Sequence, residues 1–421
     1  MVAVTLIVDN YQPVVRFVII ATVARLAATM DSMKPFLITW AAFLLFMMLL
    51  GVGFRGLPFK TDFGCFYGAG LLARTQPSHL YDLAKQRSVQ ADAVGWSNGW
   101  TLFIQPPYEA LFLEPFSLLP YRAAYLTYLA LNIVLIVPCF LLARDAFSNV
   151  IDPWQLRPGL MFFFFLPLWL GLLQGQASIR LLLLGCAAWY ELKRGRDFIA
   201  GCFLALALFK LQVILPFMFL LVVWRGLRIL GGFLAGSLAV AAVSLWLVGV
   251  SGVRDFANLV LMSSLVKGQA AAVTAATGQR PELMPNLRGL TYGCGGRYLP
   301  HEWLTGVTLA LSVALVLWIV CLLRRRPDQA TGFALALIGA VLVSYHCHSH
   351  DLTVVLLAIA LLAGRPRPHF DAIVLVCFLL PVVVLFFFVQ SHFVMAIPLL
   401  ALVAREYQLQ PVADRNVAQA V

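Results

Sequence analysis

Apolar stretches follow one another along almost the whole chain and are separated by short polar connections. A membrane-spanning helix needs about 20 apolar residues, and shorter helices are tolerated where neighbouring protein buries their ends. The pattern predicts an all-α polytopic membrane protein with about twelve transmembrane helices, in a range of ten to thirteen. The predicted spans are residues 36–53, 122–143, 159–173, 177–192, 198–209, 212–224, 229–249, 303–323, 330–345, 352–363, 371–389 and 391–404.

Basic residues mark every second connection or terminus. They are Lys34, Arg144 with Arg157, "KRGR" at 193–196, Arg225 with Arg228, "RRR" at 324–326, "RPR" at 365–367 and Arg405. Because cytoplasmic connections carry an excess of Lys and Arg, this side is predicted to be the cytoplasm, and both termini lie there. The opposite side receives two long segments, 54–121 and 250–302, and short connections near 174–176, 210–211 and 346–351. The frequent aromatic residues of 54–121 suit helices that lie on the membrane surface.

The composition agrees with a membrane protein. The chain is 62% hydrophobic and 12% charged, whereas a soluble domain carries about a quarter charged residues. The net charge of +11 does not indicate nucleic acid, because the charges lie at the ends of apolar runs. Residues 1–33 are predicted to be an N-terminal extension, interfacial or the product of a start placed too far upstream. Residues 34–405 form the transmembrane domain, and 406–421 form a cytoplasmic tail.

The cysteines and histidines provide little evidence of a metal site. The eight cysteines include no C-x-x-C pair, and nothing in the spacing of Cys65, Cys294 and Cys347, all on the predicted outer side, demands a disulfide. His346 and His350 stand four residues apart and could share one helix face, but no glutamate or second cluster completes a usual ligand set. We therefore predict no metal ligands and leave a metal requirement open.

Polar residues gather instead on the predicted outer side. Asp62 lies in "PFKTDFGCFYGAGLLA", Lys210 separates two short apolar runs, and "SYHCHSHDLT" holds three histidines and Asp351. A transporter would place polar residues within broken spans near the midplane, often in two repeated halves, and neither feature is present. The distribution favours an enzyme at the outer interface, with a transporter or flippase as the alternative.

Six features in order resemble one enzyme family. They are Asp62 in a long first outer segment, "YD" at 81–82, Pro-Pro at 106–107, Gly-Gln at 175–176, Lys210 at a helix junction, and a late segment of Ser-x-x-x-His-Asp type, here "SYHCHSHDLT". Together, residues 34–405 resemble the polyprenol-phosphate-mannose-dependent α-mannosyltransferases of the GT-C superfamily. The resemblance implies an inverting transferase that moves mannose from a polyprenyl-phosphate carrier to a glycolipid or glycan acceptor at the outer face of the cytoplasmic membrane. Besides this lipid-linked donor, the acceptor and membrane lipids, no cofactor or nucleic acid is expected.

The resemblance also implies residue roles. Asp62 matches the catalytic base, and one base suffices because the leaving group is already a phosphate. His350 is the histidine expected to act directly on the reaction or on substrate position. Positive charge near the departing phosphate would come from Lys210 and Arg288, with Arg180 and Arg74 behind them. The other residues expected to bind substrate are Tyr67, Gln105, Tyr108, Gln176, Asn286, His348 and Asp351.

Simpler alternatives and departures stand beside these roles. Asp62 could be a helix N-cap, and Lys210 could extend to the membrane interface at the end of a span. The proline that usually follows the lysine directly is delayed to Pro216, Ser178 replaces an Asn after Gly-Gln, and Gln105 replaces a Tyr before Pro-Pro. These departures leave the sugar and acceptor in question, with arabinose or glucose as the alternative sugars.

Overall fold

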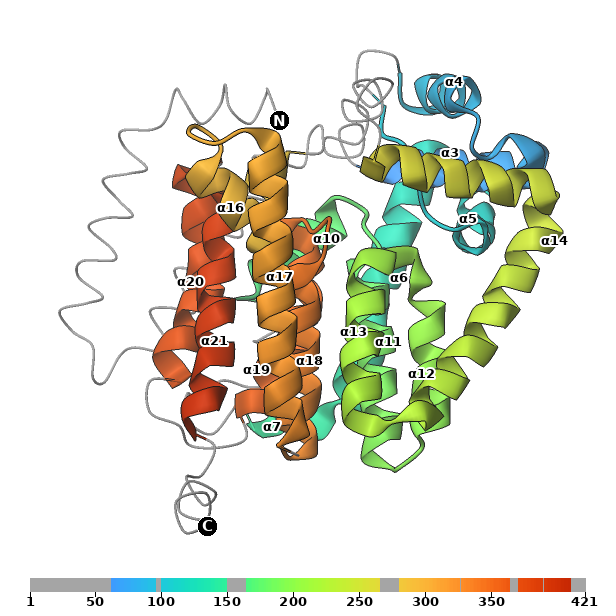
Figure 1. Cartoon of the computed structure of the whole chain (residues 1–421). Coiled ribbons are helices and arrows are strands. Elements are labelled where there is room, and N and C mark those ends of the chain that lie inside the picture. Colours follow the sequence, from blue (N-terminus) through green and yellow to red (C-terminus); the bar gives the residue numbers. More distant parts are fainter. Residues whose placement is uncertain are drawn as a thin grey trace, which may run out of the picture.

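The structure is a computed structural model and describes residues 62–95, 100–149, 164–265, 280–325, 327–363, 370–388 and 390–409. Every regular element in these ranges is a helix (Figure 1). The predicted first span, 36–53, and the N-terminal extension lie outside the described residues.

The helices fall into three groups. The bundle contains α6 (Tyr121–Leu142), α10 (Leu166–Leu173), α11 (Ser178–Lys193), α12 (Asp197–Leu206), α13 (Leu211–Arg225), α14 (Leu227–Leu265), α17 (His301–Arg324), α18 (Gln329–Val343), α19 (Val355–Ala363), α20 (Phe370–Phe387) and α21 (Ala396–Leu409). The two long segments contain α3 (Phe63–Thr75), η2 (Pro77–His79), α4 (Leu83–Val94), α5 (Pro107–Leu113), η4 (Glu114–Leu118), η6 (Pro281–Leu283) and α16 (Leu287–Gly295). The short connections contain α7 (Arg144–Asn149), η5 (Leu208–Lys210), η7 (Ser349–Val354) and η8 (His392–Met395).

Every predicted span that the structure describes contains a helix, which confirms an all-α membrane protein. The number of spans is not confirmed, because among the described residues only four helices are long and apolar enough to cross a membrane by themselves: Tyr121–Leu142, Leu208–Arg225, Leu227–Leu261 and His301–Arg324. Others, such as Gln329–Val343, are shorter. Nearly all of α18 and α19 is buried inside the bundle, so neighbouring protein rather than lipid surrounds these short apolar helices.

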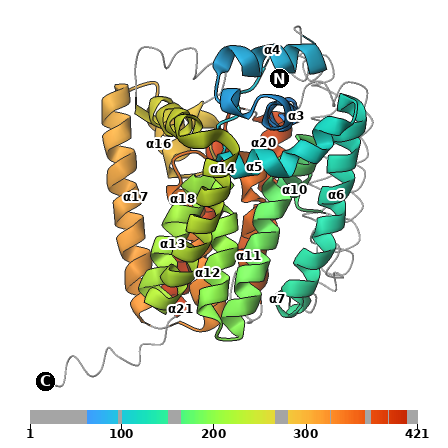
Figure 2. The same ribbon diagram turned by 90° about the vertical axis from the view of Figure 1, so that its right-hand side faces the viewer.

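The connections divide between the two ends of the bundle. In Figure 1, α3, α4, α5 and α16 lie at the upper end, whereas α7 lies at the lower end. Figure 2, turned by 90°, shows the same division, with α4 and α5 running across the bundle axis. The described parts of the two long segments, which were predicted to share one side, therefore do lie at one end.

The second long segment begins inside α14. Gly249 has φ +69°, so the helix bends there, and a residue with a side chain would be strained in this conformation. The part before Gly249 packs along α12, and the part after it runs across the upper end beside η2 and α5 (Figure 1). The predicted outer segment 250–302 thus starts with a helix that lies over the first outer segment.

Two apolar cores meet beneath the upper end. The larger core fills the bundle, with residues such as Phe217, Phe333 and Leu356 fully or almost fully buried. The smaller core lies under α3 to α5 and includes Phe63 and Tyr128. Their boundary is where polar connections from both parts come together.

The "YD" and Pro-Pro motifs shape the first outer segment. The Asp82 carboxylate accepts hydrogen bonds from the backbone N–H groups of Ala84 and Lys85 and so caps α4. The Tyr81 hydroxyl donates to the backbone oxygen of Gln105 at 2.6 Å. Pro107 occupies the first turn of α5, where the missing N–H costs nothing. These motifs build the segment that carries Asp62.

The pairing of α12 with α14 requires small residues. A Cβ atom added to Gly232 would lie 1.8 Å from the backbone oxygen of Phe198, because the two backbones touch there. A Cβ added to the neighbouring Gly231 would meet only the Phe198 ring, at 3.8 Å. The two adjacent glycines therefore differ sharply in the space around them.

Substituting these glycines tests the helix pairing. Gly232→Ala is expected to lower the thermal unfolding temperature of the purified protein in detergent, because overpacking costs about 1–3 kcal/mol. Gly231→Ala is the matched control and is expected to be neutral or slightly stabilising, since Ala is the better helix former. Equal unfolding temperatures for the two variants would contradict the close approach of α12 and α14.

Candidate active site

Asp62 occupies the N-cap position of α3, but its side chain does not cap the helix. One carboxylate oxygen, Oδ2, instead accepts a hydrogen bond of 2.6 Å from the Gln176 side-chain amide, which comes from the connection between α10 and α11. The interpretation of Asp62 as a helix cap is therefore wrong for its side chain. Its carboxylate faces the bundle, where other polar connections arrive.

The connection at 174–176 joins Asp62 to His350. Gly175 adopts φ +66°, and this tight turn directs the glutamines on either side to different partners. Gln176 binds Asp62, and Gln174 Oε1 shares a hydrogen bond of 2.8 Å with Nδ1 of His350. One turn thus contacts both residues predicted to be catalytic.

Lys210 forms a buried ion pair. Its Nζ lies 2.7 Å from Oδ1 of Asp351, and the two side chains are 8% and 0% exposed. Asp351 also accepts a hydrogen bond of 3.0 Å from the backbone N–H of His348, and Nε2 of His350 lies 3.5 Å from Oδ1. Because Lys210 is buried and paired, the alternative that it extends to the membrane interface is wrong.

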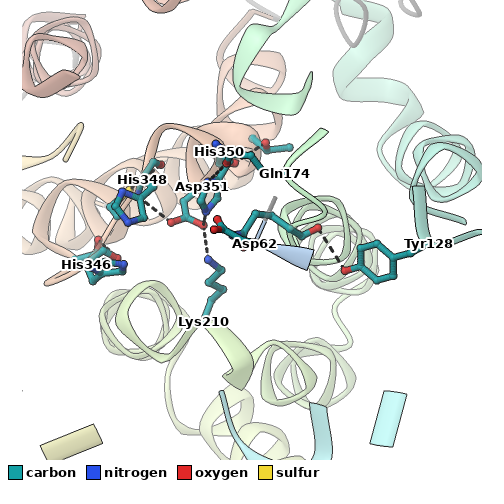
Figure 3. Close-up of polar contacts among 12 residues, drawn as sticks. Asp62, Tyr128, Gln174, Lys210, His346, His348, His350 and Asp351 are labelled. Carbon is teal, nitrogen blue, oxygen red and sulfur yellow. Dashed lines mark hydrogen bonds and ion pairs between the residues drawn. The ribbon is translucent and has the colours of Figure 1, made fainter. Parts of the chain in front are cut away.

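We call Asp62, Gln174, Gln176, Lys210, His350 and Asp351 the polar cluster. Figure 3 labels all of them except Gln176 and shows Asp62, Lys210 and Asp351 meeting from separate parts of the chain. The charges of Asp351, Lys210 and Asp62 all act on the neighbouring His348 imidazole, which places the three within electrostatic range of one histidine.

Two histidines beside the polar cluster are held neutral. Burial lowers the pKa of His346 and of His348 below the ordinary value, and the charge of Lys210 acts in the same direction. At neutral pH each ring therefore carries no charge and has one donor and one acceptor nitrogen. His346 Nδ1 is buried without a hydrogen-bond partner in the described structure. The positive charge available to an anion at the site comes from Lys210, and from Arg288 beside His346.

Arg288 and Asn286 support the histidine segment from α16. Arg288 donates to the backbone oxygen of Tyr345 at 2.9 Å, and its guanidinium lies 3.9 Å from the centroid of the Tyr345 ring. The Asn286 amide donates to the Ser344 oxygen at 2.7 Å, and its carbonyl accepts from the Gly289 N–H. Asn286 is fully buried, so both ends of its amide are engaged in holding this connection.

Three predicted substrate-binding residues support the outer segment. The Tyr67 hydroxyl donates to the Leu119 oxygen and the Tyr108 hydroxyl to the Leu206 oxygen, both at 3.0 Å. Gln105 contributes its backbone oxygen to Tyr81, and its side-chain Oε1 is buried without a hydrogen-bond partner in the described structure. The Tyr67 contact thus links α3 to the end of η4, and the Tyr108 contact links α5 to the end of α12.

Arg180 and Arg74, the two arginines expected behind Lys210 and Arg288, bind other partners. Arg180 is buried against Glu109, with both guanidinium nitrogens NH1 and NH2 bound to the carboxylate and an NH1 to Oε2 distance of 2.8 Å. Arg74 binds Ser117 near the far end of α3, about 18 Å along the helix from Asp62. Neither supplies positive charge directly to the polar cluster.

The cysteines are all unpaired, so Cys65, Cys294 and Cys347 form no disulfide with one another. The thiol of Cys65 donates to the backbone oxygen of Asp62 at 3.0 Å. Within the described residues, no three His, Cys, Asp or Glu side chains are arranged to hold a metal ion.

Sequence reasoning missed three residues in or near the polar cluster. Gln174 could have been identified from the sequence, since it begins the same polar turn as Gln176. His392, whose Nδ1 lies 2.8 Å from Ser349 Oγ, could also have been identified, because it belongs to the polar "QSH" where the last two predicted spans meet. Tyr128 could not have been, because it lies within an apolar span, yet its hydroxyl donates to the backbone oxygen of Gln176 at 3.4 Å.

Removing the charge of Lys210 tests the ion pair. Lys210→Met leaves Asp351 buried without its cation, which typically costs about 3–5 kcal/mol, so a clear drop in thermal unfolding temperature is expected. The control is Lys193→Met at the C-terminal end of α11, where the pair with Asp145 is largely exposed and worth about 0–1 kcal/mol. Similar unfolding temperatures for the two variants would contradict a buried, uncompensated Asp351.

The family comparison adds independent evidence. Residues 103–345 match the model of glycosyltransferase family 87, while no curated protein and no solved structure matches the chain. The match includes the turn at 174–176, Lys210 and Arg288, and it ends before the histidine segment and begins after Asp62. Because it covers more than half of the 421 residues, the chain belongs to glycosyltransferase family 87 and is a membrane glycosyltransferase.

Proposed function

We propose that the protein transfers a sugar, in the first instance mannose, from a polyprenyl-phosphate carrier to a glycolipid or glycan acceptor with inversion. The observation that carries the proposal is the Asp62 carboxylate, which leaves its helix uncapped and is held by Gln176 toward Lys210 and Asp351. A carboxylate held in this way suits a general base. The family match supports the reaction class, and the donor, sugar and acceptor are part of the proposal.

Asp62 would take the proton of the acceptor hydroxyl as that oxygen attacks the anomeric carbon. The bond from the anomeric carbon to the phosphate oxygen breaks at the same time, and its electron pair leaves with the phosphate. Since attack and departure occur on opposite faces of the sugar, one base gives inversion. The amide of Gln176 would keep the carboxylate aimed while it gains the proton.

Lys210 would stabilise the departing phosphate. In the structure its ammonium is bound to Asp351, which keeps the side chain extended into the polar cluster. The cation can then share its hydrogen bonds between Asp351 and a phosphate without moving far, which is favourable for catalysis. Arg288 and the neutral His346 and His348 would provide further donors, since the charges of Arg288, Lys210 and Asp351 all act on His346.

His350 would act on substrate position. Its Nδ1 is engaged by Gln174, and its Nε2 faces Asp351. These two contacts fix the ring plane, so the imidazole can orient the sugar or acceptor. The remaining predicted residues Tyr67, Gln105 and Tyr108 would shape the acceptor side through the outer segment.

A transfer assay tests the base and the donor class together. Purified protein in detergent is given radiolabelled polyprenyl-phosphate-mannose and a panel of glycolipid acceptors. Asp62→Asn is expected to lower the transfer rate by at least about 100-fold at unchanged unfolding temperature, because proton abstraction is lost. A nucleotide-linked mannose is expected to give no product.

Two results would contradict the proposal. Transfer at the wild-type rate by Asp62→Asn would exclude Asp62 as the base and direct attention to His350 and Asp351. Transfer by the wild type from polyprenyl-phosphate arabinose or glucose but not mannose would keep the reaction type and replace the sugar.

The proposal places the active site on the extracytoplasmic face of the cytoplasmic membrane and both termini in the cytoplasm. The argument is the location of the basic connections, such as 193–196 and 225–228, at the end of the bundle opposite the polar cluster (Figure 1). Cys294 on α16 is exposed at the end that holds the cluster.

A thiol-labelling experiment tests this orientation. A membrane-impermeant maleimide applied to intact spheroplasts is expected to label wild-type protein at Cys294 and not Cys294→Ser. Arg228→Cys in the Cys294→Ser background places a thiol at the opposite end, and we expect labelling only after permeabilisation. The reverse pattern would place the polar cluster in the cytoplasm.

A further inference from the structure

The packing of Phe63 positions the backbone of the preceding residue, Asp62. Phe63 is completely buried, and its ring lies 5.8, 5.7 and 5.0 Å from the rings of Tyr121, Tyr125 and Tyr128, centroid to centroid. These three tyrosines form a row along one side of α6. The row therefore holds the start of α3 against the bundle, and with it the backbone of Asp62.

The same row holds the turn that binds Asp62. The Tyr125 hydroxyl donates to the Leu173 oxygen at 2.7 Å, and the Tyr128 hydroxyl donates to the Gln176 oxygen at 3.4 Å. The turn also packs on Phe63, since a Cβ at Gly175 would lie 2.7 Å from the Phe63 Cβ. Tyr128 thus contacts the residue whose amide binds the Asp62 carboxylate.

The hydroxyl of Tyr128 has a second contact that sets its direction. Arg180 NH2 donates to this oxygen at 3.2 Å, and because a guanidinium cannot accept, the hydroxyl proton is free to point at Gln176 (Figure 3). A hydroxyl that accepts from a cation is polarised and becomes a better donor. Arg180 therefore orders Tyr128 as well as contacting it.

Glu109 completes the arrangement from α5. Its carboxylate is 1% exposed and binds Arg180 through both oxygens, and the Arg180 guanidinium also lies 4.2 Å from the centroid of Phe112. An ion pair removed from water adds little stability compared with apolar residues of the same volume. Such a pair is better explained by the geometry it imposes, here on Tyr128.

We propose that Tyr128, ordered by the Arg180–Glu109 pair, is a positioning residue that holds Gln176 so that its amide aims the Asp62 carboxylate at the acceptor. This inference rests on the proposed role of Asp62 as base. It makes a distinct claim, namely that a hydroxyl inside an apolar span sets the rate of transfer through Gln176.

The test is a double-mutant cycle on transfer rate. Tyr128→Phe keeps the ring and removes only the hydroxyl, and kcat is expected to fall by between about tenfold and about a hundredfold, with KM for the lipid-linked donor changed less than about twofold. In the Gln176→Ala background, which has already lost the tie to Asp62, Tyr128→Phe is expected to cause no further loss.

Tyr125→Phe is the matched comparison. It removes the same kind of hydrogen bond from the same helix, but to Leu173, so its effect on kcat is expected to carry over unchanged into the Gln176→Ala background. Tyr128→Phe losses that multiply with those of Gln176→Ala would overturn the inference, as would a Tyr128→Phe enzyme of wild-type rate. Both results leave the proposed function intact as long as Asp62→Asn is inactive.

Amide hydrogen exchange tests directly, without an activity assay, whether Tyr128 holds the turn at 174–176. In full-length protein in detergent, Tyr128→Phe is expected to raise amide exchange in the 174–178 peptide several-fold above both wild type and Tyr125→Phe. Unchanged exchange there would overturn the inference. If Asp62→Asn keeps wild-type transfer, the proposed function fails, and the exchange result alone then shows whether Tyr128 holds the turn.

Discussion

The packing of Phe63 into the tyrosine row of α6 is the contact on which the candidate active site depends. It joins the core of the first outer segment to the bundle, and it sets the backbone of Asp62 directly beside the turn at 174–176. This contact fixes the N-terminal end of α3 against α6, at the upper end of the bundle. The burial of the Phe63 ring thus helps to determine where the carboxylate at the N-cap of α3 points.

Charge balance is the second constraint. The site buries Lys210, Arg180 and Arg288, and two of these cations have a carboxylate partner: Lys210 pairs with Asp351, and Arg180 pairs with Glu109. The first pair keeps a cation within the polar cluster, beside His350. The second pair removes Arg180 from phosphate binding and leaves it to order Tyr128. The two ion pairs therefore differ in their neighbours: the Lys210–Asp351 pair lies beside His350, and the Arg180–Glu109 pair contacts Tyr128.

The sequence predicted the fold class and the gathering of the polar connections at one end of the bundle. Hydropathy and the alternation of basic connections suffice for this, because each helix buries its own backbone polar groups and each connection needs only to reach one end. The predicted number of spans is not confirmed. Short apolar runs such as 330–345 have the composition of a span, but only packing shows that neighbouring helices surround them.

For the site, the sequence by itself determined the chemical inventory: one acid near the start of the first outer segment, a glutamine turn, a lone lysine and a histidine segment. Only the tertiary structure decided that Asp62 binds Gln176 instead of capping α3, that Lys210 is buried with Asp351, and that Arg180 is held by Glu109. The reason is physical. Propensity and hydropathy depend on residues a few positions apart, whereas each of these pairs joins residues 71 to 141 positions apart, which only the packing of helices brings within hydrogen-bond distance.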